Sequence, residues 1–195
     1  MSKGQQTKSA ILDEAVDIAS QVGFNALTIG QLAESTGMSK SGLFAHFRSK
    51  EALQLETLER GRERFTDLVI RPTLATPRGI ARVRALLDNW LVWETEALQG
   101  GCIFVTGSIE YDDRPGPMRD ALVRSQLDWG EFIAIVAGTG VSEGDFRVDL
   151  DTEQFAFTLQ GLMYAYHHTA RLLRDPKALD RTRRAAEQLL ESARA

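Results

Sequence analysis

The 195-residue sequence predicts an all-α fold of about nine helices. Three observations predict it. Apolar residues recur at helical spacing in most segments, as Ile11, Ala15, Ile18 and Val22 do near the start. Helix-capping Ser, Thr and Asp residues stand where these segments begin, and Gly or Pro stands near their ends. The one stretch with strand-like composition, residues 102–111, would have no partner strand, so we expect a short helix there.

Two short helices are expected inside residues 25–50. Thr28 and Gln31 form a T-x-x-Q capping box before the first helix, and Gly37 ends that helix in a left-handed conformation. Ser39 begins the second helix, and helices of about two turns are not stable alone in water. Their expected shared core is Leu27, Leu32, Met38, Leu43 and Phe47. The arrangement is a helix-turn-helix, whose second helix can enter the major groove of DNA.

Longer helices surround this pair. The segment after Ser49 is expected to stop ahead of Pro72, because proline disrupts a helix interior. Residues 138–149 are expected to form the longest loop, and the GTGVSEG run within it lacks the spacing of a dinucleotide-binding fingerprint. Residues 112–117 are expected to form a turn, with a helix after it that runs to about Ala137. The other expected helices run from about Thr7 to Val22, Ser49 to Ile70, Thr76 to Leu98, Cys102 to Tyr111, Asp151 to Leu173 and Asp175 to Ala193.

The second short helix has the chemistry of a DNA-binding surface. No acidic residue occurs from Thr36 to Lys50. Lys40 and Lys50 stand at helix starts, where their ammonium groups and nearby backbone N–H groups can meet phosphates. Gly42 keeps the helix slim enough to approach base edges. The candidate DNA-binding residues are Thr28, Ser39, Lys40, Ser41, Gly42, Phe44, His46 and Lys50.

Composition agrees with a protein of the cytoplasm that has no membrane segment. No uninterrupted apolar run approaches 20 residues, and no secretory signal opens the sequence. Cys102 is the single cysteine, which excludes an internal disulfide. The net charge is −4, but residues 1–50 carry five basic and four acidic side chains. Local charge, more than the total, governs contact with phosphates.

The first 55 residues resemble the TetR family of bacterial repressors. The resemblance implies a DNA-binding domain at 1–52, a ligand-binding and dimerisation domain at 53–195, and release of DNA by an unknown small-molecule effector. Where the family usually has a phosphate-binding Tyr, this chain has Phe44, which cannot donate a hydrogen bond. The matching residues are Thr28, Leu32-Ala33, Gly37-Met38-Ser39, Leu43-Phe44, His46-Phe47 and Lys50-Glu51-Ala52-Leu53.

The helix from Asp151 has two apolar faces, one of them a stripe of the small residues Gly161 and Ala165. Such a helix is either central to its own domain or shared between subunits. The resemblance favours the second reading, because TetR proteins pair their last two helices in a four-helix dimer bundle. A two-fold dimer implies a palindromic operator. The expected interface residues are Phe155, Leu159, Leu162, Tyr166, Leu189 and Leu190.

Aromatic and polar residues in the middle of the chain suit a small-molecule pocket. The alternative is that these aromatics simply fill the core, and Cys102 is either a redox sensor or, more commonly, a buried structural thiol. The candidate pocket residues are Phe65, Asn89, Trp90, Trp93, Cys102, Phe104, Tyr111, Gln126 and Trp129.

No metal site, cofactor or enzymatic motif is expected. His167 and His168 are adjacent on a helix and point about 100° apart, which does not suit one ion. Two hypotheses follow. The first is a DNA-binding regulator, most simply a repressor, although the sequence leaves an activator open. The second is a small-molecule-binding or partner-binding helical protein with lost or weak DNA recognition.

Overall fold

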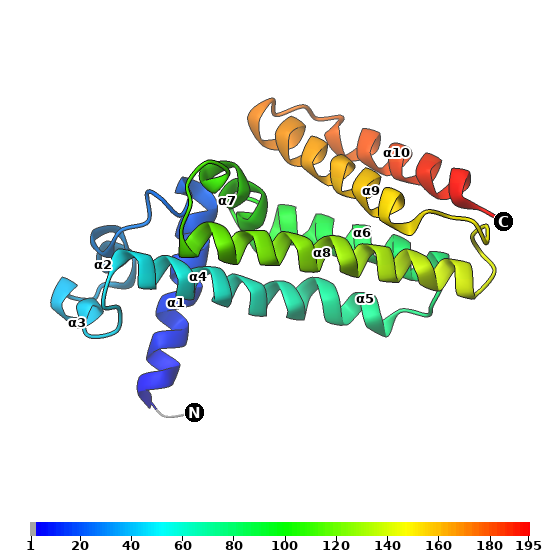
Figure 1. Ribbon diagram of the computed structural model, residues 1–195. Helices are drawn as coiled ribbons and strands as arrows, with labels where there is room; N and C mark the ends of the chain where they lie inside the picture. The colour runs from blue at the N-terminus through cyan, green and yellow to red at the C-terminus, as the bar shows by residue number, and fades with distance from the viewer. Residues whose placement is uncertain (1–2) are drawn as a thin grey trace. The chain divides into compact units, whose positions relative to one another are not determined.

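The computed structural model describes residues 3–195 and confirms the all-α fold (Figure 1). Across these residues, ten α-helical and three π-helical segments join into nine continuous helices. An isolated antiparallel bridge joins Phe146 and Arg194. None of the helices in this part of the chain combines the length and apolarity needed to span a membrane. The described residues divide into two compact units, 3–66 with 94–125, and 67–93 with 126–195.

The first unit contains the helix-turn-helix and the helices that brace it. Helix α1 packs against α2, α4 and α7. Its core includes Ile11, Ala15 and Val16, all at most 2% exposed. The helices of this unit are α1 (Lys3–Val22), α2 (Ile29–Thr36), α3 (Lys40–Phe44), α4 (Lys50–Phe65), α7 (Ile103–Tyr111) and the start of α8 (Pro117–Ser142).

The first unit does not end at residue 52, where the sequence placed the boundary of the DNA-binding domain. Helix α4 runs across that position and packs along α1, with Leu53 and Leu58 buried. Arg60 also joins α4 to α1 through two hydrogen bonds to the Asp13 carboxylate, at 2.8 and 2.9 Å. A cut at residue 52 would therefore divide a continuous packed helix.

The second unit is built around the packing of α9 against α10 and of α5 against α6. Trp90 of α6 meets Tyr166 of α9 edge to face, with the ring centroids 6.1 Å apart. Phe146 and Phe155 add a second aromatic pair, at 5.8 Å. The elements are α5 (Arg71–Ala75), α6 (Ile80–Val92), the rest of α8, α9 (Thr152–His167), the π-helical segment His168–Leu172, and α10 (Ala178–Ala193).

The expected stop ahead of Pro72 is wrong. A π-helical segment, Thr66–Ile70, connects α4 directly to α5, and Pro72 lies in the first turn of α5. Proline is tolerated in a first helical turn, where its missing N–H would have no intrahelical acceptor. The π turn therefore lets the helix restart at the proline without a break.

Two other helix ends also differ from the sequence expectation. Helix α6 begins at Ile80, since the N–H groups of Gly79 and Ile80 are bound by Thr139 Oγ1 at 3.1 Å and Asp145 Oδ2 at 2.8 Å. Helix α8 continues to Ser142, so the expected loop at 138–149 is shorter. Gly140 permits this, because the Phe146 ring occupies the space that a Cβ at Gly140 would fill.

Candidate nucleic-acid interface

The helix-turn-helix of the first unit forms as its capping residues predict (blue to cyan in Figure 1). Thr28 Oγ1 accepts from the Gln31 N–H at 3.2 Å, and the Gln31 side chain accepts from the Thr28 N–H at 3.2 Å. Gly37 ends α2 with φ of 67°. Ser39 Oγ then accepts from the Gly42 N–H at 3.1 Å and starts α3. Each of these contacts is local, which is why the sequence reveals it.

The expected shared core is largely confirmed. Leu27, Leu32, Leu43 and Phe47 are all 0% exposed, whereas Met38 in the turn is half-buried. This packing fixes the short helices α2 and α3 against each other, and α1 and α4 support them. Neither helix is long enough to be stable without that support.

The face of α3 opposite this core is polar and basic. Lys40 and Ser41 are exposed, and the Phe44 ring is 59% exposed. Helix α3 ends at Phe44, so His46 lies just beyond it. His46 is half-buried, and its ring lies beside Phe47 with the centroids 6.3 Å apart. Thr28, Ser39 and Lys50 are exposed, and Gly42 is half-buried. All eight candidate residues lie in the first unit.

The two lysines have different surroundings. The Lys40 side chain lies over the first turn of α2, where a Cβ built on Gly30 would be 3.9 Å from Nζ. Lys50 Nζ donates to the backbone carbonyl of Asn25. The sequence did not indicate this second contact, since Asn25 lies 25 residues earlier. Lys50 therefore fastens the start of α4 to the loop before α2 while remaining exposed.

The backbone of Phe24 joins the helix-turn-helix to α4 and α7. The Phe24 N–H donates to Glu110 Oε2 of α7 at 2.8 Å. Its carbonyl accepts from Gln54 Nε2 of α4 at 2.7 Å. Sequence reasoning missed both partners, because the bonds span 86 and 30 residues and no local pattern marks them.

The two hydrogen bonds of the Phe24 backbone form a brace between the helix-turn-helix, α4 and α7. Two glycines allow the end of α1 to approach this brace closely. Gly23 has φ of 83°, and the Glu110 carboxylate occupies the space where its Cβ would be. Gly100 lies directly against the backbone of Ser20 and Gln21, and its N–H donates to Ser20 Oγ at 3.0 Å. The segment before α7 therefore contacts the end of α1 backbone to backbone.

We expect Glu110→Ala to lower the free energy of unfolding by about 1–3 kcal/mol, because it leaves the Phe24 N–H without its acceptor. Glu110→Gln keeps an acceptor oxygen and should lose less. Urea unfolding followed by circular dichroism measures both. Exposed Glu96, in the same unit, supplies the control. The Glu96→Ala variant should stay within about 0.5 kcal/mol of wild type, and equal losses at Glu110 and Glu96 would contradict the role of Glu110.

Four of the nine candidate pocket residues lie in the first unit. Phe65 and Phe104 meet edge to face with the centroids 5.4 Å apart. Buried Cys102 donates its backbone N–H to Glu94 Oε2 at 2.6 Å. Burial raises the pKa of the Tyr111 hydroxyl. The Tyr111 side chain is buried, and the Arg114 guanidinium lies 6.0 Å from the centre of its ring.

The other five candidate pocket residues lie in the second unit. Asn89 Nδ2 donates to the buried Thr73 hydroxyl at 3.1 Å. Trp90 and Trp93 are at most 2% exposed, and Gln126 is half-buried. Trp129 stacks on Phe132 at 5.8 Å. Because the nine residues are divided between the two units, a single pocket formed by them remains a prediction.

The structure corrects the expected dimer surface. Phe155, Leu159, Tyr166 and Leu190 are at most 5% exposed, so they belong to the core of their own subunit. Leu162 and Leu189 are half-buried. On this face, α9 is therefore central to its own domain, which is the first of the two alternatives that the sequence left open. The opposite face of α9 is the exposed one, and its members are Phe157, Gly161 and Ala165.

Comparison with known proteins gives two family matches. Residues 11–57 match the family described as bacterial regulatory proteins, tetR family. Residues 79–186, more than half of the chain, match the tetracyclin repressor-like C-terminal domain. Together these two matches cover both the helix-turn-helix and the helices that follow it.

Individual relatives agree with these matches. The transcriptional regulator RutR of Escherichia coli K12 is 37% identical over 81 residues, which is 42% of this chain and 36% of RutR. A TetR-family regulator from Cytophaga hutchinsonii superposes with a TM-score of 0.86 at 18% identity, covering 100% of this chain and 98% of that one. AibR, crystallised with isovaleryl coenzyme A and operator DNA, gives a TM-score of 0.67 at 20% identity over 82% of this chain and 85% of AibR. The chain belongs to the TetR family of bacterial regulatory proteins.

Proposed function

We propose that this protein is a sequence-specific transcriptional regulator that binds a palindromic DNA operator as a homodimer and releases it when a small molecule binds. The observation that carries the proposal is the exposed face of α3 and of the turns on either side of it. That face is free of acidic residues from Thr36 to Lys50, and it presents Lys40, Ser41 and Phe44 outward from a fixed core. Family membership supports the same function.

The first turn of α2 suits a phosphate of the DNA backbone. Helix N-termini carry unpaired N–H groups and a partial positive charge, both of which favour anions. Lys40 adds a full positive charge beside Gly30 in that turn. A cation at this end of a helix is unfavourable by itself, and a bound phosphate would neutralise it. Phosphate contacts of this kind would position α3 in the major groove without reading sequence.

Base recognition is proposed for Ser41 and Phe44 of α3, with His46 near its end. Ser41 can hydrogen-bond to base edges, and an exposed phenyl ring can contact a thymine methyl group. Phe44 also supports the second candidate function, a small-molecule-binding or partner-binding protein with weak DNA recognition, because a phenyl ring cannot donate to a phosphate. Direct measurement of DNA binding separates the two.

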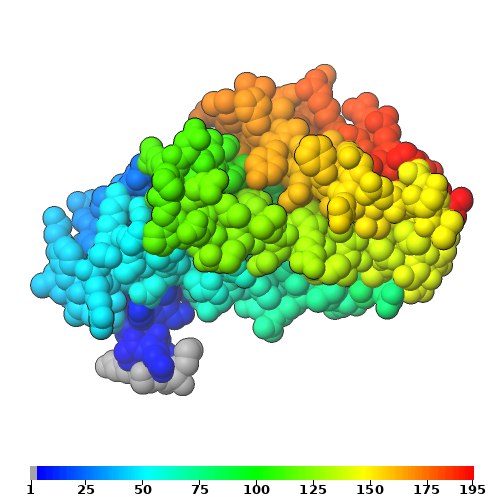
Figure 2. Space-filling view, in the orientation of Figure 1, coloured from blue at the N-terminus to red at the C-terminus, as the bar shows by residue number. Residues whose placement is uncertain are grey.

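The dimer is proposed to form through the exposed face of α9, visible in yellow to orange in Figure 2. Phe157 is 72% exposed there. A Cβ built on Gly161 would meet nothing within 4 Å, and Ala165 follows four residues later. Small residues allow a second helix to approach closely, and a large exposed apolar side chain favours being covered. Two-fold symmetry would then match a palindromic operator.

The effector is proposed to bind among the nine candidate pocket residues. AibR, which was crystallised with an acyl coenzyme A and DNA together, provides a precedent within the same fold. Effector and DNA would then be linked thermodynamically, so that each weakens the binding of the other by the same factor. The chemical identity of this effector is open.

Selection of bound sequences from a random DNA pool tests the proposal. We expect enrichment of a palindrome whose affinity falls steeply with salt, because phosphate contacts release counterions. Competition of the selected DNA with a panel of metabolites then tests for an effector. Recovery of no sequence above the background of the pool, or binding that is insensitive to salt, would favour the second candidate function.

Lys40→Ala should weaken binding to all DNA sequences by a similar factor. Loss of one phosphate contact in each protomer should also reduce the slope of log K against log salt by about one per protomer. Fluorescence anisotropy over a salt series measures both. Lys177→Ala removes a lysine from the second unit and should change neither quantity. An unchanged slope in the Lys40 variant would remove Lys40 from the interface.

A further inference from the structure

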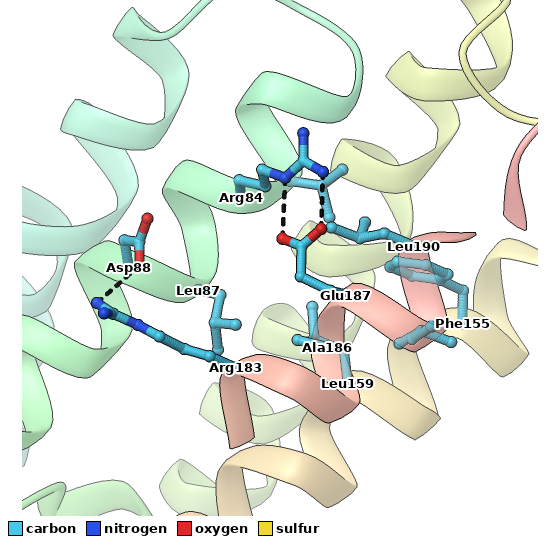
Figure 3. A pocket seen from close by; sticks show the side chains of 11 residues that line it. Arg84, Leu87, Asp88, Phe155, Leu159, Arg183, Ala186, Glu187 and Leu190 are labelled. Carbon is cyan, nitrogen blue, oxygen red and sulfur yellow. Dashed lines mark hydrogen bonds and ion pairs between the residues drawn. The ribbon is translucent and has the colours of Figure 1, made fainter. Parts of the chain in front are cut away.

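Helices α6, α9 and α10 line a half-open pocket of about 330 Å³ in the second unit (Figure 3). This volume lies within the range of small-molecule sites. The floor is apolar, and each of the three helices contributes to it. Its members are Val83 and Leu87 of α6, Phe155 and Leu159 of α9, and Ala186 and Leu190 of α10. The pocket shares no residue with the nine candidate residues expected from the sequence.

Two ion pairs lie at the rim of this pocket. Arg84 Nε and Nη2 donate to the two oxygens of Glu187 at 3.0 and 2.7 Å. Arg183 Nη2 lies 3.4 Å from Asp88 Oδ1. The hydrogen bond from Arg84 lowers the pKa of the Glu187 carboxyl, so the pair is charged at neutral pH. Figure 3 shows both pairs joining α6 to α10 beside the apolar floor.

The unused hydrogen-bonding groups of this rim are mostly donors. A guanidinium has five N–H donors and no acceptor. Among residues 3–195, Nη1 of Arg84 and both Nε and Nη1 of Arg183 donate to no protein oxygen. Each oxygen of Glu187 already accepts one N–H, and Asp88 accepts through one of its two oxygens. The rim is therefore better suited to accept an additional anion than an additional cation.

We propose that this pocket binds a small amphiphilic carboxylate, with its apolar tail between α6, α9 and α10 and its carboxylate on Arg84 and Arg183. The apolar floor would take a hydrocarbon tail out of water. Arginine binds a carboxylate through paired N–H groups, in the geometry that Arg84 already adopts with Glu187. The ligand therefore competes with Glu187 for Arg84. This binding does not require the protein to bind DNA.

Three eight-carbon probes test the charge preference: octanoate, octan-1-ol and octylamine, each titrated into the full chain by calorimetry. They share one tail and differ in the head group. We expect octanoate to bind about threefold to fivefold more tightly than the other two, since ion pairs of exposed side chains contribute up to about 1 kcal/mol. Equal affinities, tighter binding of octylamine, or no binding of octanoate to the folded protein would overturn the proposal.

Variants of the rim test the site itself. Arg84→Gln should weaken octanoate about threefold to fivefold and leave octanol unchanged. Glu187→Gln should tighten octanoate severalfold, because it removes the charged competitor for Arg84. Arg71→Gln is the matched control, since it breaks the exposed ion pair with Asp67 in the same unit and lines no part of the pocket. An equal effect of Arg71→Gln and Arg84→Gln, or weaker binding to Glu187→Gln, would overturn the assignment.

No DNA enters these measurements. A negative result for octanoate binding therefore does not bear on the proposed DNA-binding function. A negative result for operator binding likewise does not bear on the carboxylate site. If both hold, adding octanoate to the complex of protein and selected DNA shows whether this pocket communicates with the DNA-binding helices.

Discussion

Gly100→Ala is expected to lower the free energy of unfolding by about 3 kcal/mol or more, at the upper end of the range for overpacked sites. A Cβ at this position would overlap the backbone of Ser20 and Gln21 in α1. Backbone atoms cannot rotate aside as a side chain can, so the two segments must separate. Separation would also break the hydrogen bond from the Gly100 N–H to Ser20 Oγ.

Thermal and urea unfolding measure this loss, and a fall in Tm of about 6 °C or more is expected for a chain of this size. Gly138→Ala is the matched control. Gly138 lies inside α8, and a Cβ there would meet nothing within 4 Å. Alanine is the better helix former, so this variant should gain about 0.5–1 kcal/mol. Equal stability of the Gly100 variant and wild type would contradict the close contact of this segment with α1.

Phe157→Arg is expected to raise the dissociation constant of the proposed dimer by about a hundredfold or more, equivalent to about 2.8 kcal/mol. The substitution would place one guanidinium from each protomer near the two-fold axis without an acidic partner. Burying unpaired charges costs several kcal/mol, and like charges repel one another. Monomers would then bind each half-site separately and lose the gain in affinity from joint binding.

Sedimentation velocity over a range of protein concentrations measures the dimer, and anisotropy on the selected palindrome measures its effect on DNA binding. Val148→Arg adds the same side chain at a position that is 91% exposed in the turn after α8. This control should remain dimeric. A wild-type protein that is monomeric at high concentration, or a Phe157 variant that stays dimeric, would contradict the proposed face of α9.

The helix-turn-helix was predictable because its signals are local. The caps at Thr28, Ser39, Ser49 and Asp151 each bind an N–H group three residues later, so the sequence pattern contains both partners. The apolar core of α2 and α3 follows from the same short range. The family resemblance rests on this region, and the comparisons confirm it.

Other features depend on partners that are distant in sequence. Helix α6 begins at Ile80 because Asp145, 65 residues later, binds its first N–H group. The two faces of α9 are both apolar in sequence, so only the packing of α6 and α10 shows that Phe155 and Leu159 are buried while Phe157 is exposed. The pocket beside Arg84 depends on residues from three helices, and no local pattern brings them together.

The brace at Phe24 also bears on how such a protein can diversify. Both of its bonds end on main-chain atoms of Phe24, so every residue except proline would keep the donor as well as the acceptor. Inheritance of the link therefore depends on Glu110, on Gln54 and on the space that Gly23 leaves for the Glu110 carboxylate. Mutations that change which DNA is recognised can accumulate in α3, and the connection from α7 into that region would pass to the descendants unchanged.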